Sequence, residues 1–208
     1  MKLVVLGATG GTGLEIVRQA IEHGHQVTAL VRNPERLEPF GSRVTVMRGN
    51  LLESSELGRA FRGQDAILSG FGPRYPISKA EADLLERFAV ALTIAMRQVG
   101  VRRVAVESTA FLFKDSFLPL AYLIGKLFFP ITVADAAAME QIIGKSGLDW
   151  TIVRPPRLTN KPRTGNYRVR EGHLPGFGFT ISRADVADFM IETVEKRASI
   201  GKVVGVCN

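Results

Sequence analysis

The sequence predicts a single α/β domain in which helices cover both faces of a mostly parallel sheet. Apolar runs typical of strands buried on both faces alternate along the chain with amphipathic segments of helical period. The first such pair is a strand over residues 2–6 and a helix over residues 14–23, joined by a glycine-rich turn. Because the 208 residues suit one core and contain no repeat or linker, residues 1–208 are predicted to form one doubly wound domain of the Rossmann type.

The glycine-rich turn has the spacing Gly-x-x-Gly-x-x-Gly, at Gly7, Gly10 and Gly13. In this pattern the first glycine permits a tight turn, the second lets the backbone approach a pyrophosphate, and the third lets the helix pack close to the strand. The N-terminus of the helix then offers N–H groups and a partial positive charge to the phosphates. An ordinary βα turn is the alternative, but the flanking strand and helix favour a dinucleotide site. Its predicted contacts are Gly7, Thr9, Gly10, Gly11, Thr12 and Gly13.

A second predicted strand, over residues 26–31, ends at Arg32. NAD-binding sites use a carboxylate here on the ribose 2′-hydroxyl; it would repel a 2′-phosphate, whereas arginine pairs with one. Arg36 follows about one helical turn later and is expected to supply a second cation. Two solvent-facing arginines are the alternative, and we expect NADP(H) rather than NAD(H).

Two further predicted strands, over residues 44–47 and 64–69, flank a short helix over residues 55–61. The third strand of such a fold ends beside the adenine, so Asn50 is expected to bond the ring and Leu51 to pack on its face.

After the fourth strand, Phe71 and Gly72 are expected to pass close to the middle of the cofactor. Arg74 is a candidate contact for a phosphate or for the substrate, with an exposed loop arginine as the alternative.

The longest helical pattern covers residues 80–99, and a fifth strand over residues 103–107 follows it. Ligands of open α/β sheets bind at the carboxyl ends of the strands, so Ser108 and Thr109 are candidate catalytic residues. Thr109 is also expected to contact the cofactor by orienting the nicotinamide; capping of backbone groups is its alternative role.

Residues 111–133 form an apolar stretch with Lys114, Asp115 and Lys126 as its only charges. Its uncharged run is too short to span a bilayer. We expect a short helix over residues 120–129 above the cleft, where it would cover an apolar substrate, meet a partner or touch a membrane surface.

The rest of the chain is expected to complete the sheet. The predicted elements are a helix over residues 135–145, a strand over 150–153, a loop and hairpin over 160–170 turning at Gly165-Asn166, a helix over 184–196 and a strand over 202–206. Pro155 and Arg157 follow the sixth strand at the same edge, Pro155 beside the cofactor and Arg157 as a candidate catalytic residue. Residues 108–133 and 154–180 are therefore predicted to form the substrate cleft.

Composition limits the partners and the compartment. Lys and Arg number 27 against 20 Asp and Glu, a net charge of +7, but the basic residues are spread along the whole chain. This spread argues against a nucleic-acid partner, and a positive field also attracts an anionic cofactor or a small-molecule acceptor. The N-terminal apolar run is too short for a secretory signal, so a cytoplasmic protein is expected. A monomer or a weak dimer is the expected oligomeric state.

Metal binding is not expected. Cys207 is the single cysteine, which excludes a disulfide within the chain and disfavours a cysteine-type metal cluster. His23 and His25 flank Gly24 at a predicted helix end, where capping or solvent exposure is the expected role rather than metal ligation.

Five stretches carry a likeness to a known family. They are residues 7–13 (GATGGTG), 30–32 (LVR), 49–51 (GNL), 108–111 (STAF) and 146–155 (SGLDWTIVRP). On these motifs the whole chain resembles the NmrA-like NAD(P)-binding group of atypical short-chain dehydrogenases/reductases. Within that group it is most similar to the biliverdin-IXβ reductase, or flavin reductase, family, through residues 108–113 and 154–167.

The resemblance implies an NADPH-dependent reductase that passes hydride to a flavin or a linear tetrapyrrole; a non-catalytic NADP(H) sensor of the NmrA-like type is the alternative. By the resemblance, Gly7, Gly10, Thr12 and Gly13 would hold the pyrophosphate, Arg32 and Arg36 the 2′-phosphate, and Thr109 would replace a serine near the nicotinamide. The chain departs from the pattern at Asn50, where an aspartate is usual, and at Ala136 and Arg157, where that family has histidines in or near its pocket.

A Tyr–Lys pair completes the site of full short-chain dehydrogenases, and this chain contains Tyr122 and Lys126 at the required spacing. The pair lies in the apolar stretch rather than in the helix that leads to Trp150, so we interpret it as coincidental. Hydride transfer to a conjugated acceptor needs no such pair, because the acceptor delocalises the charge and solvent can protonate it. A basic group after the sixth strand would suit propionates or an FMN phosphate, unless it is only a solvated hairpin. Its members are Arg157, Lys161, Arg163, Arg168 and Arg170.

Overall fold

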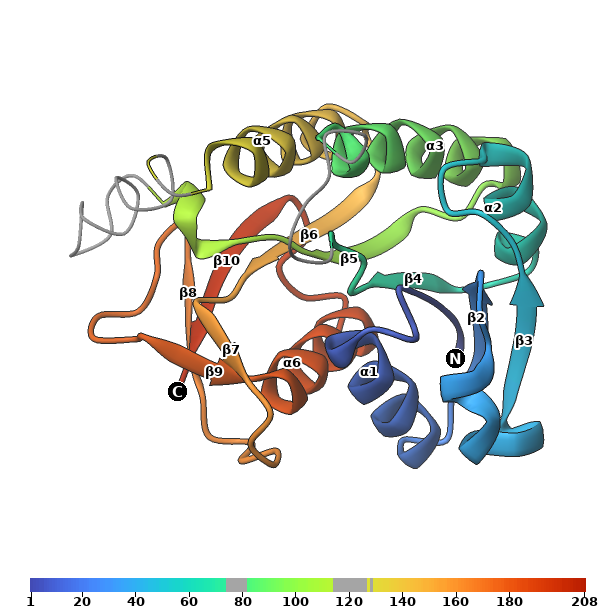
Figure 1. Cartoon of the computed structure of the whole chain (residues 1–208), viewed down its shortest axis with the longest axis horizontal. Helices are drawn as coiled ribbons and strands as arrows, with labels where there is room; N and C mark the ends of the chain where they lie inside the picture. The colour runs from blue at the N-terminus through green and yellow to red at the C-terminus, as the bar shows by residue number, and fades with distance from the viewer. Residues whose placement is uncertain (74–81, 114–126, 128) are drawn as a thin grey trace.

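The computed structural model describes residues 1–73, 82–113, 127 and 129–208, and an eight-stranded sheet is its centre (Figure 1). The strands of the chain are β1 (Lys2–Leu6), β2 (Gln26–Val31), β3 (Val44–Arg48), β4 (Ala66–Ser69), β5 (Arg103–Glu107), β6 (Asp149–Arg154), β7 (Arg157–Thr159), β8 (Arg168–Glu171), β9 (Thr180–Ser182) and β10 (Lys202–Cys207). The large sheet has the order β3-β2-β1-β4-β5-β6-β10-β8, and only β8 is antiparallel to its neighbour. The order reverses between β1 and β4, so a topological switch point lies at the end of β1, where such sheets bind ligands.

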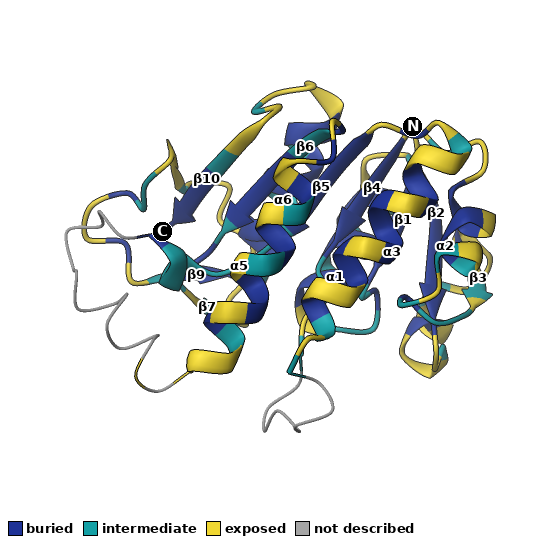
Figure 2. Ribbon diagram, turned by 90° about the horizontal axis from the view of Figure 1, so that it is seen from above, coloured by how far each residue is buried: buried dark blue, intermediate teal, exposed yellow. Residues whose placement is uncertain are grey.

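Helices cover both faces of this sheet. They are α1 (Gly11–Glu22), α2 (Ser54–Phe61), α3 (Leu84–Val99), α5 (Pro130–Gly144) and α6 (Arg183–Glu195), with 3-10 helices η1 (Glu35–Arg43) and η3 (Ala110–Leu112). Helices α1 and α6 pack together on one face, and α2, α3 and α5 pack on the other (Figure 1). In Figure 2 the central strands are buried, whereas the helices expose one side. The predicted doubly wound α/β fold is therefore confirmed.

The two apolar layers explain why the first strand is apolar throughout. Leu3 and Val5 belong to the core on the α1 and α6 side, and Val4 and Leu6 belong to the core on the α2 and α3 side. Side chains alternate between the two faces of a strand, so a strand covered on both faces needs apolar residues at every position.

A buried arginine ties the sheet to the end of α6. Arg103, the first residue of β5, is 2% exposed and donates to the carbonyl oxygens of Asp149 (2.7 Å), Thr193 (2.9 Å) and Ala198 (3.0 Å). Burial is the main influence that lowers the pKa of this guanidinium to about 10. The cation thereby joins carbonyl oxygens of β6, of the last turn of α6 and of the loop that follows it.

An aspartate of one helix caps the start of another. Asp135 in α5 is buried, and its two carboxylate oxygens accept the backbone N–H groups of Leu85 and Glu86, each at 2.9 Å. Those N–H groups lie in the first turn of α3, whose own N-cap, Asp83, makes no side-chain capping bond to the helix. A contact across 50 residues therefore does what a local cap does in most helices.

Several predicted boundaries were wrong. The hairpin over residues 160–170 does not form, because β7 pairs in parallel with β9, and β8 pairs with β10. The loop between β7 and β8 is instead held by Asp185, which accepts the N–H groups of Thr164 (2.8 Å) and Gly165 (3.0 Å). The helix predicted over residues 135–145 begins five residues earlier, at Pro130, a residue that suits the first turn of a helix.

The apolar stretch 111–133 is described only at its two ends. The predicted helix over residues 120–129 lies outside the described residues except at Leu127 and Phe129. Within the ranges that the structure describes, no helix has the length and hydropathy needed to cross a bilayer.

Candidate functional site

The glycine turn brings the start of α1 into direct contact with β1 and β4. Gly7 has a φ of +70°, and a Cβ atom there would lie 2.7 Å from the amide nitrogen of Phe71. A Cβ atom on Gly13 would collide with the carbonyl oxygen of Gly7. Both positions therefore require glycine, Gly7 for its conformation and both for the close approach of backbone.

The N-terminus of α1 is open to a ligand. Its N-cap, Gly10, provides no side-chain hydrogen bond, and no acidic residue lies in the first turn. The first N–H groups of a helix have no partner within the helix, and they carry a partial positive charge. The start of α1 can therefore hold an anionic group such as a pyrophosphate.

Arg36 reaches this turn from η1. Its Nη1 donates to the carbonyl oxygen of Thr9 at 2.6 Å, although 27 residues separate the two along the chain. Arg32 directly follows β2, and both arginines are exposed. Because β1 and β2 are parallel neighbours, two cations lie at the same edge as the glycine turn, where a 2′-phosphate would be placed.

The predicted adenine contacts have other partners in the structure. Asn50 accepts the N–H of Leu52 on Oδ1 at 3.1 Å, and its own N–H donates to Glu56 at 2.6 Å. Leu51 is 8% exposed and lies in the core on the α2 and α3 side, so it has little surface left for a ring.

Phe71 and Gly72 follow β4 beside the glycine turn. The ring of Phe71 packs on Phe88 of α3 with 4.9 Å between centroids, so its backbone rather than its ring borders Gly7. Arg74, the third predicted contact of this segment, lies outside the described residues.

The end of β5 forms a buried ion-pair network. The Ser108 hydroxyl donates to Glu140 of α5 at 2.5 Å, and Arg154 of β6 donates to both oxygens of the same carboxylate, at 2.9 and 2.5 Å. The Arg154 guanidinium also lies 4.6 Å from the ring centroid of Phe113. Ser108 therefore anchors β5 to α5 through Glu140, a residue that the sequence interpretation did not assign to the site.

Thr109 and Pro155 meet at the same edge. The Thr109 hydroxyl oxygen accepts the N–H of Phe111 at 3.3 Å and caps η3, while Ala110 donates to the carbonyl of Pro155 at 3.0 Å. The capping role considered for Thr109 is thus present, and the same edge holds the strand ends that would face a nicotinamide. Arg157, two residues after Pro155, is exposed on β7.

A second carboxylate, that of Glu107 at the end of β5, faces the start of α1, and the sequence interpretation missed it too. The Thr12 hydroxyl donates to its Oε1 at 3.3 Å, and its Oε2 lies 3.5 Å from the position of a Cβ atom on Gly70. Burial raises the pKa of Glu107 to about 7, against the opposing effects of Thr12 and of Arg183. An acidic residue at the end of a strand buried on both faces was the available signal.

Arg183 lies on the other side of the turn. Its side chain covers Gly11, since a Cβ atom there would lie 2.6 Å from Cδ and Nε of Arg183. Its Nη1 donates to Asn160 at 2.6 Å. A third cation, from the start of α6, therefore borders the glycine turn.

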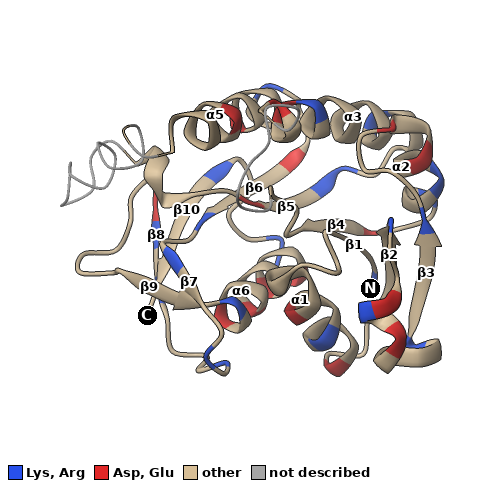
Figure 3. Ribbon diagram, in the orientation of Figure 1, with Lys and Arg blue, Asp and Glu red and all other residues tan. Residues whose placement is uncertain are grey.

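Two members of the predicted basic group are bonded to the protein. Arg163 pairs with Asp188 of α6 at 3.2 Å, and Arg168 donates to the carbonyl oxygens of Gly176 (2.5 Å) and Asn208 (3.0 Å). Acidic and basic residues are interspersed over the helices (Figure 3). Arg157, Lys161 and Arg170 are the other members of the group; they are exposed, and the described residues make no such contact with them.

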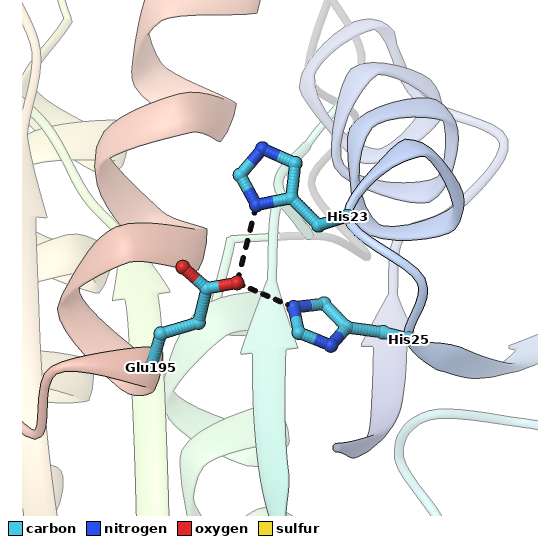
Figure 4. A group of neighbouring side chains, drawn as sticks. All are labelled: His23, His25 and Glu195. Atoms are coloured by element: carbon cyan, nitrogen blue, oxygen red, sulfur yellow. Dashed lines mark hydrogen bonds and ion pairs between the residues drawn. The ribbon is translucent and has the colours of Figure 1, made fainter.

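Two histidines and a glutamate converge at the far ends of α1 and α6 (Figure 4). Oε1 of Glu195 lies 3.1 Å from His23 Nδ1 and 2.7 Å from His25 Nε2, and the amino group of Met1 lies 3.2 Å from His25 Nδ1. If Nε2 carries the His25 proton, His25 donates to Glu195 and accepts from Met1. Hydrogen bonds thus account for the cluster as a tie between the two helices.

Comparisons with known proteins agree with this architecture. A family model described as NAD(P)H-binding matches residues 7–197. An uncharacterised chloroplastic protein of Arabidopsis thaliana is 33% identical over 98% of this chain and 75% of its own length. These matches confirm the resemblance at the level of this family.

Two solved structures share the fold. A short-chain dehydrogenase/reductase of Veillonella parvula in complex with NADP has a TM-score of 0.83 at 18% identity, covering 100% of this chain and 94% of that one. The anaerobilin reductase ChuY of Escherichia coli O157:H7 has a TM-score of 0.82 at 20% identity, covering 100% and 97%.

Proposed function

We propose that this chain, which belongs to the NAD(P)H-binding family, is an NADPH-dependent reductase that transfers hydride to a conjugated acceptor such as a flavin or a linear tetrapyrrole. The observation that carries the proposal is the meeting of an uncapped helix N-terminus with Arg36 at the glycine turn. One edge of the sheet thus offers a place for the pyrophosphate and a cation for the 2′-phosphate.

NADPH is preferred over NADH in this proposal because of Arg32 and Arg36. The position after β2 holds a cation instead of the carboxylate that binds a ribose 2′-hydroxyl. Arg36 already donates one bond to the turn and keeps further N–H groups for a phosphate. The NADP complex of the structurally similar dehydrogenase supports this choice at the level of the fold.

A conjugated acceptor is proposed because the described part of the site offers no Tyr–Lys pair. In related enzymes the tyrosine and lysine precede Glu140 in the helix that leads to Trp150. Their positions in this chain hold Thr132 and Ala136, and Ala136 is buried in the core. Tyr122 and Lys126 lie outside the described residues. When bound, NADPH would supply the hydride, and the protein's part is to position its ring against an acceptor that delocalises charge.

A turnover screen tests the proposal. Purified protein is mixed with NADPH and with FMN, riboflavin or biliverdin in turn, and loss of the reduced nicotinamide absorbance is followed. The proposal expects consumption with at least one acceptor, and faster consumption with NADPH than with NADH. No consumption across the panel would refute the reductase assignment.

An exposed aromatic surface favours a second candidate, a non-catalytic NADP(H) sensor that docks on a protein. Phe177 and Phe179, between β8 and β9, are 76% and 59% exposed, and Phe177 has a φ of +59°. Large exposed apolar groups often mark interaction sites. Tight NADPH binding without turnover of any acceptor would favour this second function.

A further inference from the structure

The phosphates of a bound cofactor would compete with Glu107 for the hydroxyl group of Thr12. Its carboxylate accepts the Thr12 hydroxyl at 3.3 Å, and Thr12 lies in the first turn of α1, among the N–H groups that suit a pyrophosphate. Thr12 is 4% exposed, and in the absence of a ligand its hydroxyl is turned toward Glu107. The single hydroxyl proton can serve either Glu107 or a phosphate oxygen, but not both.

Few groups around Glu107 stabilise its negative charge against the cost of burial. From α1 it meets only the hydroxyl of Thr12, and the end of β4 presents Gly70, which has no side chain. From α6, Arg183 provides the one charge among the described residues that acts on this carboxylate. On the neighbouring strand β6 the paired residue is the apolar Val153.

Bound phosphates would remove part of this stabilisation of the Glu107 charge. Arg183 covers Gly11 at the start of α1, so the same guanidinium that attracts Glu107 borders the phosphate-binding turn. A pyrophosphate there would add negative charge near the carboxylate and would draw on both Arg183 and the helix N-terminus. Each effect favours the neutral form of Glu107.

We propose that Glu107 is a proton-binding residue of the dinucleotide site: NADPH binding drives one proton from solvent onto its carboxylate, and the carboxyl group then donates to Thr12. The Thr12 hydroxyl is thereby released to donate to the pyrophosphate. No bond other than the O–H bond of Glu107 forms, and buffer supplies the proton. This inference rests on the proposed NADPH site and adds a pH control to it.

The expected pH dependence follows from linkage. In the free protein the pKa of Glu107 is about 7, and bound phosphates raise it. NADPH therefore binds best below that pKa, and its affinity falls by up to about tenfold per pH unit as the pH rises from 7.5 to 8.5. At pH 8 binding should take up roughly 0.5 to 1 proton.

Calorimetry measures this uptake directly. NADPH is titrated into the whole protein at pH 8 in HEPES and in Tris, two phosphate-free buffers whose ionisation enthalpies differ. At that pH the 2′-phosphate is fully ionised, because its second pKa is about 6, so it contributes no proton. The difference in heat between the two buffers divided by the difference in their ionisation enthalpies is the number of protons taken up.

Two variants sharpen the test. Glu107→Gln keeps the shape and imitates the neutral acid, so its uptake should be near zero and its affinity should not change with pH. Glu22→Gln alters an exposed carboxylate at the far end of α1 and should retain the wild-type uptake. Thermal melting checks that both variants fold, and the pH dependence of the wild-type Kd is a second measurement that needs no variant.

The outcomes separate the two proposals. If wild-type protein binds NADPH with equal heat in both buffers, or if Glu107→Gln takes up as many protons as wild type, the role of Glu107 is refuted while the cofactor site stands. If NADPH does not bind at all, both the reductase proposal and this inference fail.

Discussion

Replacing Gly13 by alanine tests whether the close contact between strand and helix shapes the cofactor site. The added Cβ atom would collide with the carbonyl oxygen of Gly7 and lie 2.8 Å from Cα of Ala8. Both are backbone atoms, so no side chain can rotate away, and α1 must shift relative to β1. Overpacking of this kind costs about 1–3 kcal/mol.

This cost sets the expected size of the effects. In a domain of about 200 residues, 1 kcal/mol lowers Tm by about 2–4 °C, so Gly13→Ala should melt about 2–12 °C below wild type. The shift also displaces the N–H groups at the start of α1. Loss of one hydrogen bond to a charged phosphate, worth about 1.5–3 kcal/mol, should weaken NADPH binding by about 10- to 100-fold.

Gly58 provides the matched control. It also lies in a helix, in α2, but a Cβ atom there would meet only Val99, at 3.9 Å, which is ordinary contact. Gly58→Ala gains helix propensity of up to about 1 kcal/mol, so its Tm should equal or exceed that of wild type, with NADPH binding unchanged. Melting by circular dichroism and NADPH titration are run on both variants. If Gly13→Ala melts and binds like Gly58→Ala, the argument from backbone contact is wrong.

Three other predictions concern charge. Arg32→Glu should weaken NADPH binding at least tenfold more than NADH binding in fluorescence titrations, since a carboxylate repels the 2′-phosphate but not a 2′-hydroxyl; equal losses would contradict the assigned role. Arg154→Met strands the buried carboxylate of Glu140 and should cost about 3–5 kcal/mol in urea unfolding, whereas a double variant that also carries Glu140→Leu should recover part of it; a loss below 1 kcal/mol would argue against the ion pair. For Asp185, burial raises the pKa, but hydrogen bonds from Asn208, the loop N–H groups and Ser182 outweigh it, and the net pKa is lowered. This stabilisation is present above the unfolded pKa of about 4 and is lost as the pH falls below it. Asp185→Asn should therefore lose less stability than wild type between pH 5 and pH 3. Identical losses would contradict a stabilising role for the ionised Asp185 carboxylate.

The strands and the glycine turn could be predicted because their signals are local. The predicted bounds of β2 and β5 agree with the structure, since each is an apolar segment enclosed by polar residues. The 3-10 helix η1 was missed because Pro39 and Gly41, residues that commonly end helices, interrupt its sequence. Strands β7 and β9 were missed because three residues are too few to show alternation.

The candidate site was predictable only in its cofactor half. Arg32 and Arg36 could be named as candidates because the position after β2 has a fixed place in this fold. Glu140 was not identified, because a carboxylate within a helix has no sequence signal until its partner is known, and the signal for Glu107, an acidic residue at the end of a buried strand, does not name its partner. Glu107 lies 95 residues along the chain from its partner Thr12, and Glu140 lies 32 residues from its partner Ser108.

By itself, the sequence determined the doubly wound fold and the glycine turn, and it led to the expectation that this turn binds a dinucleotide with a 2′-phosphate. These depend on backbone conformation and apolar period over a few residues, which any chain of this pattern must satisfy. Only the tertiary structure decided which polar groups meet: Thr12 with Glu107, Ser108 and Arg154 with Glu140, and His23 with Glu195. Strand order places these residues side by side, and strand order follows from packing two apolar layers on one sheet, a property of the whole chain.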